Sequence, residues 1–314
     1  MIAPARPWSA LDYVRDVYAR ERLDLSEGSR KKLETDCRIL DLWNDGKPFL
    51  LDEFSREAVI DWMRWLAEHH KSSPATINSK RAGVMAIWAD AAAKGYAPPL
   101  PNSRDPQQRV PKRIEPERIP VTWSLAEIDR LFAACAKLKG QWDGVPVSLC
   151  WITALLLFWD TAGRLFEVVS AKVRCLDVDR KFLFCPAEDR KGRRRDRIYP
   201  LHQQTIDLYK ATLPGAPGIS GSRDLVFPFP YCRRQLQIHL TKLLKLAGLP
   251  HDAKHKFHCI RRSAESYAAA ERGLQWAADA VGHSAAVARK SYVSPVIAPG
   301  PVLIDALPRP ALPL

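Results

Sequence analysis

Residues 149–167, LCWITALLLFWDTAGRLFE, join an apolar run to a short charged turn. The run covers the first 11 residues, up to Trp159, so it is too short to cross a bilayer and predicts a buried helix. Arg164 follows directly on this helix and its glycine. A guanidinium at the end of a buried element is costly unless it is paired, so Arg164 either pairs with Glu167 or binds an anion such as phosphate.

The composition around this stretch is that of a globular protein. The chain has 314 residues, of which 46% are hydrophobic and 26% are charged, enough for a core and about two domains. Its seven cysteines are odd in number and none are spaced as Cys-x-x-Cys, which predicts reduced thiols and neither a disulfide framework nor a zinc site. The N-terminus lacks the apolar stretch of a signal peptide, so we expect a cytoplasmic protein without a membrane partner.

Positive charge gathers in the second part of the chain. The formal net charge is +13, and residues 1–110 carry 17 Lys/Arg against 16 Asp/Glu, whereas residues 111–314 carry 31 against 19. Such a balance suggests a polyanionic partner. Residues 98–120 contain seven prolines, which remove backbone donors and predict an extended linker. The predicted parts are a helical domain over 1–97, the linker over 98–120, a second domain over 121–295 and a Pro-rich tail over 296–314.

The first part has the pattern of a small helical bundle. Ser73-Pro74 is a typical helix start, and the segment up to Gly95 repeats apolar residues on one face: Ile77, Val84, Ile87, Trp88 and Ala91. Similar spacing recurs over residues 33–43 and 59–66. The basic residues along this bundle are candidates to contact phosphate, although a solvated helix face explains each of them equally well: Lys71, Lys80 and Arg81.

The second part mixes helices with short strands. Ser124 to Glu127 has the pattern of a capping box that opens an amphipathic helix. Alternating residues then predict strands over Val173–Asp179, Lys181–Cys185 and Arg197–Leu201. Helices are expected again near Gln203 and over 233–247, 261–272 and 275–281. The predicted fold is mainly α with a small antiparallel β-sheet.

Three further segments carry candidate chemistry, and each is a weak signal alone. Residues 190–197, RKGRRRDR, form a basic turn between two predicted strands, either a solvated loop or an anion site. His258 and Arg261 open a helix at positions i and i+3, which share one face. Gly282-His283 is followed, nine residues after the histidine, by Tyr292.

In this order the four segments resemble the tyrosine recombinase (phage integrase) family. Its six catalytic positions are matched in this chain by Arg164, Lys191, His258, Arg261, His283 and Tyr292. Glu167 matches the acidic residue three positions after the first arginine, and residues 197–201, RIYPL, resemble the strand that closes the family's hairpin. Residues 73–98 resemble the last helices of the family's N-terminal domain, so the resemblance covers about residues 8–295.

The resemblance implies a helical, SAM-like core-binding domain followed by an α+β catalytic domain. It implies site-specific DNA recombination through a 3′-phosphotyrosine, with Tyr292 as nucleophile and His258 as general base. Arg164 and Arg261 would hold the non-bridging oxygens, Lys191 would protonate the departing 5′-oxygen, and His283 would hydrogen-bond the phosphate. Glu167 would orient its neighbours. No cofactor or metal is expected, since no ligand-spaced Asp, Glu and His cluster stands near these motifs.

Three departures from the family pattern qualify these assignments. The turn reads Thr-Ala-Gly-Arg where Thr-Gly-Leu-Arg is more usual. Arg262 stands where many members have a second histidine, as a further cation for the phosphate or for solvent. The hairpin is about one residue longer than usual, so Arg190 or Arg193 are alternatives to Lys191.

The expected partner is double-stranded DNA, held between the two domains. Its other candidate contacts lie on the predicted helix over 233–247, for which a solvated face is the alternative: Arg233, Arg234, Lys242 and Lys245. The family suggests a monomer or weak oligomer that assembles as a tetramer on paired DNA sites. Within the tail, residues 302–307 either dock on a neighbouring protomer or fray. Two other functions remain open: a topoisomerase IB-like nicking and closing enzyme, and an inactive DNA-binding regulator on the same fold.

Overall fold

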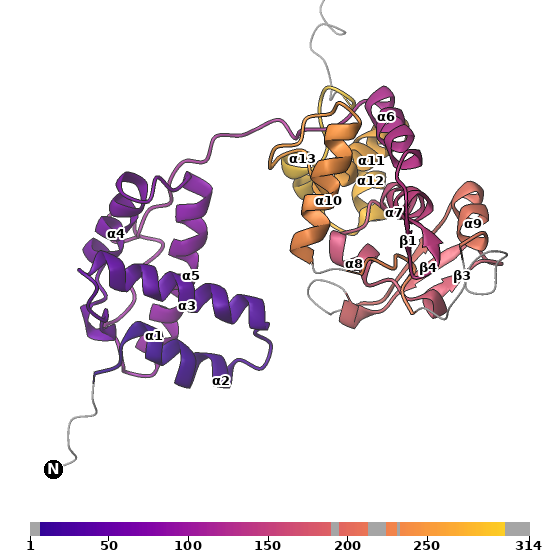
Figure 1. The fold of residues 1–314 in the computed structure, drawn as a ribbon. Helices are drawn as coiled ribbons and strands as arrows, with labels where there is room; N and C mark the ends of the chain where they lie inside the picture. The colour runs from indigo at the N-terminus through magenta and orange to yellow at the C-terminus, as the bar shows by residue number, and fades with distance from the viewer. Residues whose placement is uncertain (1–6, 190–194, 213–223, 231–232, 299–314) are drawn as a thin grey trace, which may run out of the picture. The chain divides into compact units, whose positions relative to one another are not determined.

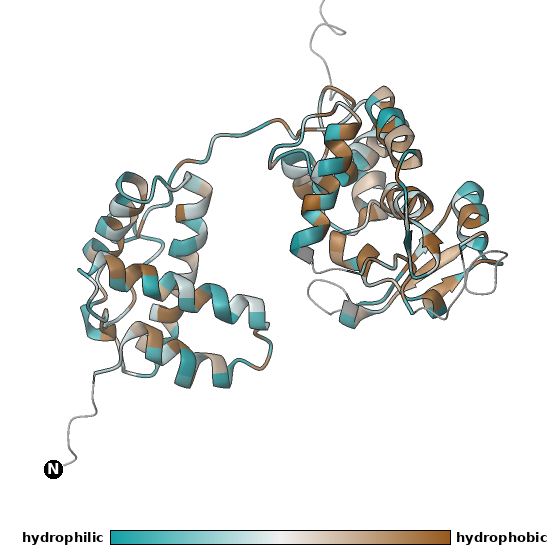
Figure 2. Cartoon of the chain, viewed as in Figure 1, coloured by the Kyte–Doolittle hydropathy of each residue, from teal (hydrophilic) through white to brown (hydrophobic). Residues whose placement is uncertain are grey.

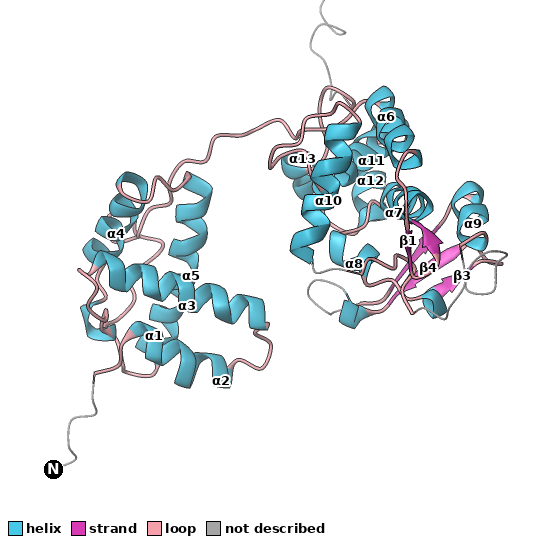
Figure 3. Cartoon of the chain, in the orientation of Figure 1, coloured by secondary structure: helices cyan, strands magenta, loops and turns pink. Residues whose placement is uncertain are grey.

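The computed structural model describes residues 7–189, 195–212, 224–230 and 233–298. The chain divides into two compact units, Met1–Pro116 and Glu117–Leu314. Helices dominate both units, and the strands lie in the second (Figure 3). The predicted fold class, mainly α with a small antiparallel sheet, is confirmed.

Unit 1 is a helical bundle whose helices begin at serines. Ser9, Ser26, Ser55 and Ser73 each accept a hydrogen bond from the backbone N–H three residues on, which satisfies a donor that the first helical turn leaves free. Ser73 and Pro74 open their helix as predicted. The elements of the unit are α1 (Ala10–Tyr13), the π-helical η1 (Val14–Tyr18), α2 (Ala19–Glu21), α3 (Glu27–Trp43), the 3₁₀ turn η2 (Leu51–Glu53), α4 (Arg56–Glu68) and α5 (Pro74–Ala93).

The core of unit 1 is built around large aromatic side chains. All five residues predicted to face inward on α5 are buried. Trp88 of this helix stacks on Phe54 with ring centroids 5.3 Å apart. Trp62 of α4 is fully buried too, although the apolar spacing in the sequence did not single it out. An aromatic core of this kind supports a small unit because each ring removes a large apolar area from water.

The Pro-rich segment has no helix or strand, but its first part belongs to unit 1. The Trp88 indole N–H donates to the carbonyl of Pro98 over 2.8 Å. Val110 is buried in the core of unit 1, and the guanidinium of Arg81 donates to its carbonyl over 2.5 Å. The unit boundary at Pro116 therefore lies within the segment that the sequence predicted as a linker.

Unit 2 packs its helices around α7 (Val147–Thr161), which contacts α6 (Leu125–Ala136), α9 (Gln203–Lys210) and α11 (Phe257–Arg272) (Figure 1). The apolar run predicted to form a buried helix is the body of α7, with Trp151, Leu155 and Phe158 about 1% exposed. In the part of the chain that the structure describes, no helix combines the length and apolar character needed to cross a membrane. The remaining helices of the unit are α8 (Leu165–Val169), α10 (Arg233–Leu246), α12 (Leu274–Val281) and α13 (Ala285–Ser291).

Helix α10 is amphipathic, as its place on the surface of unit 2 requires. Figure 2 shows teal and brown alternating along it. Four of its leucines are buried in the core of the unit, namely Leu236, Leu240, Leu243 and Leu244, and Leu246 at its end is exposed. Ser124 and Glu127 form the predicted capping box at the start of α6.

A three-stranded antiparallel sheet has the order β3 (Leu176–Asp177), β4 (Phe182–Cys185), β5 (Arg197–Pro200). The first strand is shorter than predicted, because Val173–Cys175 forms a 3₁₀ turn, η3. The N–H of Val173 binds the carbonyl of Asp224, so its partner comes from a segment far along the chain. The other short elements are the hairpin β1 (Gln141–Trp142) and β2 (Val145–Pro146), and the turn η4 (Ala187–Asp189).

The turn that ends α7 needs a left-handed residue at Ala162 and a residue without a side chain at Gly163. Ala162 adopts a left-handed conformation with φ of 43°. A Cβ atom on Gly163 would lie 2.7 Å from Oγ1 of Thr161 and 3.1 Å from Cγ2 of Val168. That hydroxyl accepts a hydrogen bond from the Gly163 N–H over 2.9 Å, so it is not free to move away. Any side chain at residue 163 would therefore clash with its neighbours. Residue 162 must adopt the left-handed conformation even though it is an alanine.

We predict that Ala162→Gly stabilises unit 2. Glycine adopts the left-handed conformation without the steric cost that alanine has. This gain exceeds the cost of the larger conformational entropy of glycine in the unfolded chain, so the free energy of unfolding should rise by about 0.5–1 kcal/mol. Calorimetry of the full chain measures the effect as a rise in the melting temperature of this unit. The matched variant Gly163→Ala adds the same methyl group one residue later and lowers that temperature. A lower melting temperature for Ala162→Gly would contradict this account of the turn.

Candidate active site

Arg164 and Glu167 form the ion pair that the sequence offered as one alternative. Arg164 is the N-cap of α8, and its backbone N–H donates to Oε2 of Glu167 over 2.9 Å. Its Nη1 lies 3.2 Å from the other carboxylate oxygen. The pair does not exclude the anion-binding alternative, because a guanidinium has five N–H donors and this side chain remains 27% exposed.

Glu167 is held as a carboxylate although its side chain is only 2% exposed. Burial by itself raises the pKa of Glu167, but the Arg164 N–H and guanidinium and the Tyr199 hydroxyl outweigh it and leave the pKa below its ordinary value. The Tyr199 hydroxyl donates over 3.0 Å from strand β5. Glu167 thus ties the turn after α7 to the sheet.

Arg261 of α11 is a buried cation. It is 1% exposed, and its Nη1 donates to the carbonyl of Ala162 over 2.5 Å. Its Nε and Nη2 are buried and have no hydrogen-bond partner among the residues that the structure describes. Burial lowers the pKa of Arg261, yet an arginine stays charged at neutral pH. A buried cation with two unsatisfied donors is costly, and an anion that accepts from both would offset the cost.

Tyr292 and His283 lie against this arginine. The centre of the Arg261 guanidinium is 4.8 Å from the centroid of the Tyr292 ring. The imidazole of His283 stacks on the same phenol ring, with centroids 4.9 Å apart and planes 17° from parallel. Helices α11 and α13 and the loop after α12 therefore bring three predicted site residues into direct contact.

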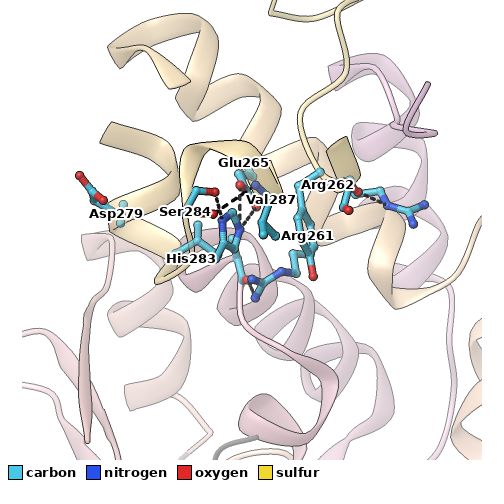
Figure 4. A network of polar contacts seen from close by, with 12 residues as sticks. Arg261, Arg262, Glu265, Asp279, His283, Ser284 and Val287 are labelled. Carbon is cyan, nitrogen blue, oxygen red and sulfur yellow. Dashed lines mark hydrogen bonds and ion pairs between the residues drawn. The ribbon is translucent and has the colours of Figure 1, made fainter. Parts of the chain in front are cut away.

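Two neighbours of this group were not identified from the sequence. Glu265, one turn after Arg261 on α11, is fully buried and lies against the His283 ring (Figure 4). Arg197 of β5 donates to the carbonyls of Val281 and Ala280, at the end of α12 and just before His283. A Cβ atom on Gly282 would collide with that guanidinium. The spacing of Glu265 from Arg261, four residues on one helix, was the signal available in the sequence.

The structure describes some of the other predicted site residues and not the rest. His258 is exposed in the first turn of α11, one turn before Arg261. The guanidinium of Arg262 donates to the carbonyl of Ser291, just before Tyr292 (Figure 4). Lys191 and its alternatives Arg190 and Arg193 lie outside the described residues, as does the tail segment 302–307.

Some of the candidate DNA contacts are exposed, and others already have a hydrogen-bond partner in the protein. Four of them have exposed side chains: Lys71, Arg234, Lys242 and Lys245. Arg233 lies in α10, but its side chain is not among those that the structure describes. Lys80 instead donates to the buried carboxylate of Asp36 over 2.8 Å, and Arg81 is bonded to Val110. Their roles in DNA binding stay predictions. Within the described ranges, no group of three or more His, Cys, Asp or Glu is placed to hold a metal ion.

Comparison with known proteins gives one family and several similar folds. The model of the Phage integrase family matches residues 124–295. A Tn1549 transposon integrase in complex with transposon right end DNA has a TM-score of 0.66 and 14% identity, covering 90% of this chain and 95% of that one. A lambda integrase tetramer bound to a Holliday junction has a TM-score of 0.63 and 14% identity, covering 89% and 75%. No curated protein sequence matches the chain.

We predict that Glu167→Gln destabilises the protein in a pH-dependent way. The lowered pKa of Glu167 means that its carboxylate contributes stability above the ordinary value of 4.5, and that this contribution is lost as the pH falls through the folded value. At neutral pH the variant should lose about 1–3 kcal/mol. Urea unfolding across a pH series should show the difference from wild type shrinking below pH 4.5. A difference that stays constant with pH would refute the assigned cause.

We also predict that Lys80→Met weakens unit 1 itself. The change leaves the Asp36 carboxylate, 2% exposed, with Lys32 as its remaining lysine partner, at a cost of about 1–3 kcal/mol. The exposed Lys71→Met serves as the matched control, with unchanged melting temperature of unit 1 in calorimetry. Equal melting temperatures for Lys80→Met and wild type would show that the buried pair contributes no stability.

Proposed function

The chain belongs to the phage integrase family and is a tyrosine-type site-specific recombinase, and we propose that it cuts and rejoins DNA through a 3′-phosphotyrosine on Tyr292. The observation that carries this proposal is the buried guanidinium of Arg261, which has two donors without a partner among the described residues and lies 4.8 Å from the Tyr292 ring. A phosphodiester is an anion whose non-bridging oxygens accept from such donors.

The proposed reaction exchanges one phosphoester bond for another. The Tyr292 oxygen attacks the scissile phosphorus, a bond to Tyr292 forms, and the bond to the 5′-oxygen breaks. His258 takes the phenol proton, and the departing 5′-oxygen receives a proton from Lys191. Arg164 and Arg261 meet the charge that develops on the non-bridging oxygens. A 5′-hydroxyl of a second strand then attacks the phosphotyrosine and restores the free phenol.

This chemistry requires neither ATP nor a metal ion. The phosphotyrosine retains the bond that rejoining uses, so no external energy source enters. The positive charges are the guanidinium groups of Arg261 and Arg164. The carbonyl of Ala162 holds the first in place, and Glu167 holds the second. Guanidinium groups fixed in this way stabilise a phosphoryl transition state without the reorganisation that water would need.

The proposed partner is double-stranded DNA, and the candidate contacts include basic side chains of both units. The excess of basic residues after position 110 supplies the electrostatic attraction, and affinity should fall steeply with added salt. We propose a monomer or weak oligomer in solution that forms a tetramer on paired sites, in the cytoplasm and at the nucleoid. The similar lambda integrase structure is a tetramer on a Holliday junction.

The test is a suicide DNA substrate, with a nick beside the cleavage point, taken from the ends of the element that carries the gene. The wild-type protein should form a covalent adduct with DNA, and Tyr292→Phe should form none, because a phenylalanine has no oxygen to attack phosphorus. Tyr96→Phe, an exposed tyrosine of unit 1, is the matched control and should form the adduct. An adduct that survives in Tyr292→Phe would refute the nucleophile.

Strand transfer separates the proposed function from its alternatives. A recombinase joins strands from two sites, a topoisomerase IB-like enzyme only relaxes supercoiled DNA, and an inactive regulator binds without forming an adduct. Recombinant products in an assay with two sites would therefore support the proposal, and relaxation alone would overturn it.

A further inference from the structure

Helix α11 holds the segment that carries Tyr292 on both sides of the tyrosine. Before it, Nε of Arg262 donates to the carbonyl of Ser291 over 3.2 Å (Figure 4). After it, the N–H of Ser294 donates to the hydroxyl of Ser266 over 2.9 Å. The same hydroxyl donates to the carbonyl of Tyr292 itself over 3.3 Å. Arg262 and Ser266 stand four residues apart on α11, so they share one face of that helix.

These contacts satisfy polar groups that the Tyr292 segment cannot satisfy by itself. Ser266 is fully buried and Ser294 is 1% exposed, so loss of the bond between them would leave buried groups unpaired. The carbonyl of Ser291 belongs to the last turn of α13, where carbonyls have no partner inside the helix and a cation is the favourable donor. Neither Arg262 nor Ser266 takes part in the chemical steps of the proposed reaction.

Apolar packing alone leaves the position of this segment poorly defined. Val293 is buried in a small cluster whose other buried members are all alanines: Ala269, Ala277, Ala278 and Ala288. Hydrophobic contact has no direction, whereas a hydrogen bond fixes the distance and the angle between two groups. The hydrogen bonds from α11 therefore set where the backbone of residue 292 lies.

The backbone position in turn decides where the phenol lies. The Tyr292 ring centroid is 4.8 Å from the guanidinium of Arg261, which also belongs to α11. One helix thus carries both the cation of the site and the groups that hold the tyrosine. Attack on phosphorus needs the reacting atoms about 3–3.5 Å apart and aligned, and a misplacement of about 1 Å costs up to about 100-fold in rate.

We propose that Arg262 and Ser266 are positioning residues that hold the backbone of Tyr292 on α11, so that its phenol stays beside Arg261 before DNA binds. The proposal rests on the proposed function for the role of Tyr292 as nucleophile. The alternative for Arg262, a direct contact with phosphate, makes a different prediction for DNA affinity.

Arg262→Met tests the first contact, because it keeps an apolar stem and removes the donor to Ser291. Single-turnover cleavage of the suicide substrate at saturating DNA should slow about 10-fold or more. Arg262→Lys keeps a charged donor and should recover part of the rate. The matched control is Arg272→Met, which removes an exposed arginine from the same helix and should cleave at the wild-type rate. The Kd for DNA should be equal in Arg262→Met and Arg272→Met, and a higher Kd with an unchanged rate at saturation would overturn the proposal in favour of a phosphate contact.

Ser266→Ala tests the second contact against a serine with the same local chemistry. Ser263 is also fully buried on α11, and its hydroxyl accepts the N–H of Trp123 over 2.7 Å. Both Ser266→Ala and Ser263→Ala should lower the melting temperature of unit 2, because each leaves a backbone N–H without its acceptor. Well below that temperature, only Ser266→Ala should slow cleavage, again by about 10-fold or more. A wild-type rate in Ser266→Ala would show that its role is structural and would refute the proposal.

A spectroscopic measurement tests the inference without DNA or activity. Fluorine NMR of the protein labelled with 3-fluorotyrosine reports the surroundings of each phenol, and Tyr292→Phe identifies the signal of Tyr292 among the eight tyrosines. Arg262→Met and Ser266→Ala should move this signal toward that of free 3-fluorotyrosine, and Ser263→Ala should leave it in place. A signal unmoved by both variants would refute the positioning role even if the proposed function fails, whereas absence of a wild-type DNA adduct would count against the proposed function alone.

Discussion

The candidate active site depends on one contact, the hydrogen bond from the buried guanidinium of Arg261 to the carbonyl of Ala162. It joins α11 to the turn that ends α7, and so brings the first and second arginines of the site to the same place. The same guanidinium lies over the Tyr292 ring, which lies at the end of α13. Loss of this contact would leave a charge in the core with no acceptor, so the fold and the site share one constraint.

Most of the site residues stand at the ends of helices, where backbone geometry controls the direction of a side chain. Ala162 leaves α7 in a left-handed conformation, and Arg164 caps α8. Gly282 ends α12 at a positive φ of 83°, with Arg197 against its backbone. Arg262 holds the last turn of α13 through the carbonyl of Ser291. Short helices with fixed ends thus aim His283 and Tyr292 at each other, and burial of α7 supplies the rigid base.

Periodicity predicted the helices of unit 1 well, because buried faces repeat every three or four residues whatever their partner is. It failed where the partner is distant in sequence. The strand expected from Val173 starts three residues later, since Asp224 supplies the acceptor. The partners of Lys80 and Arg81, which are Asp36 and the carbonyl of Val110, also lie far from them in the sequence, and the roles of both residues in DNA binding stay predictions. A sequence shows which residues are charged, but it does not show which carboxylate or carbonyl each of them contacts in the fold.

The sequence by itself determined the helical class, the buried helix α7 and the residue types of the candidate site, because these follow from local spacing and from the order of the motifs. Only the tertiary structure decided that Arg261 is buried with two donors unpaired among the described residues, that Arg164 is already paired with Glu167, and that Glu265 contacts His283. Each of these facts depends on side chains brought together from different helices. The free energy of a buried charge is set by such neighbours, and no window of sequence contains them.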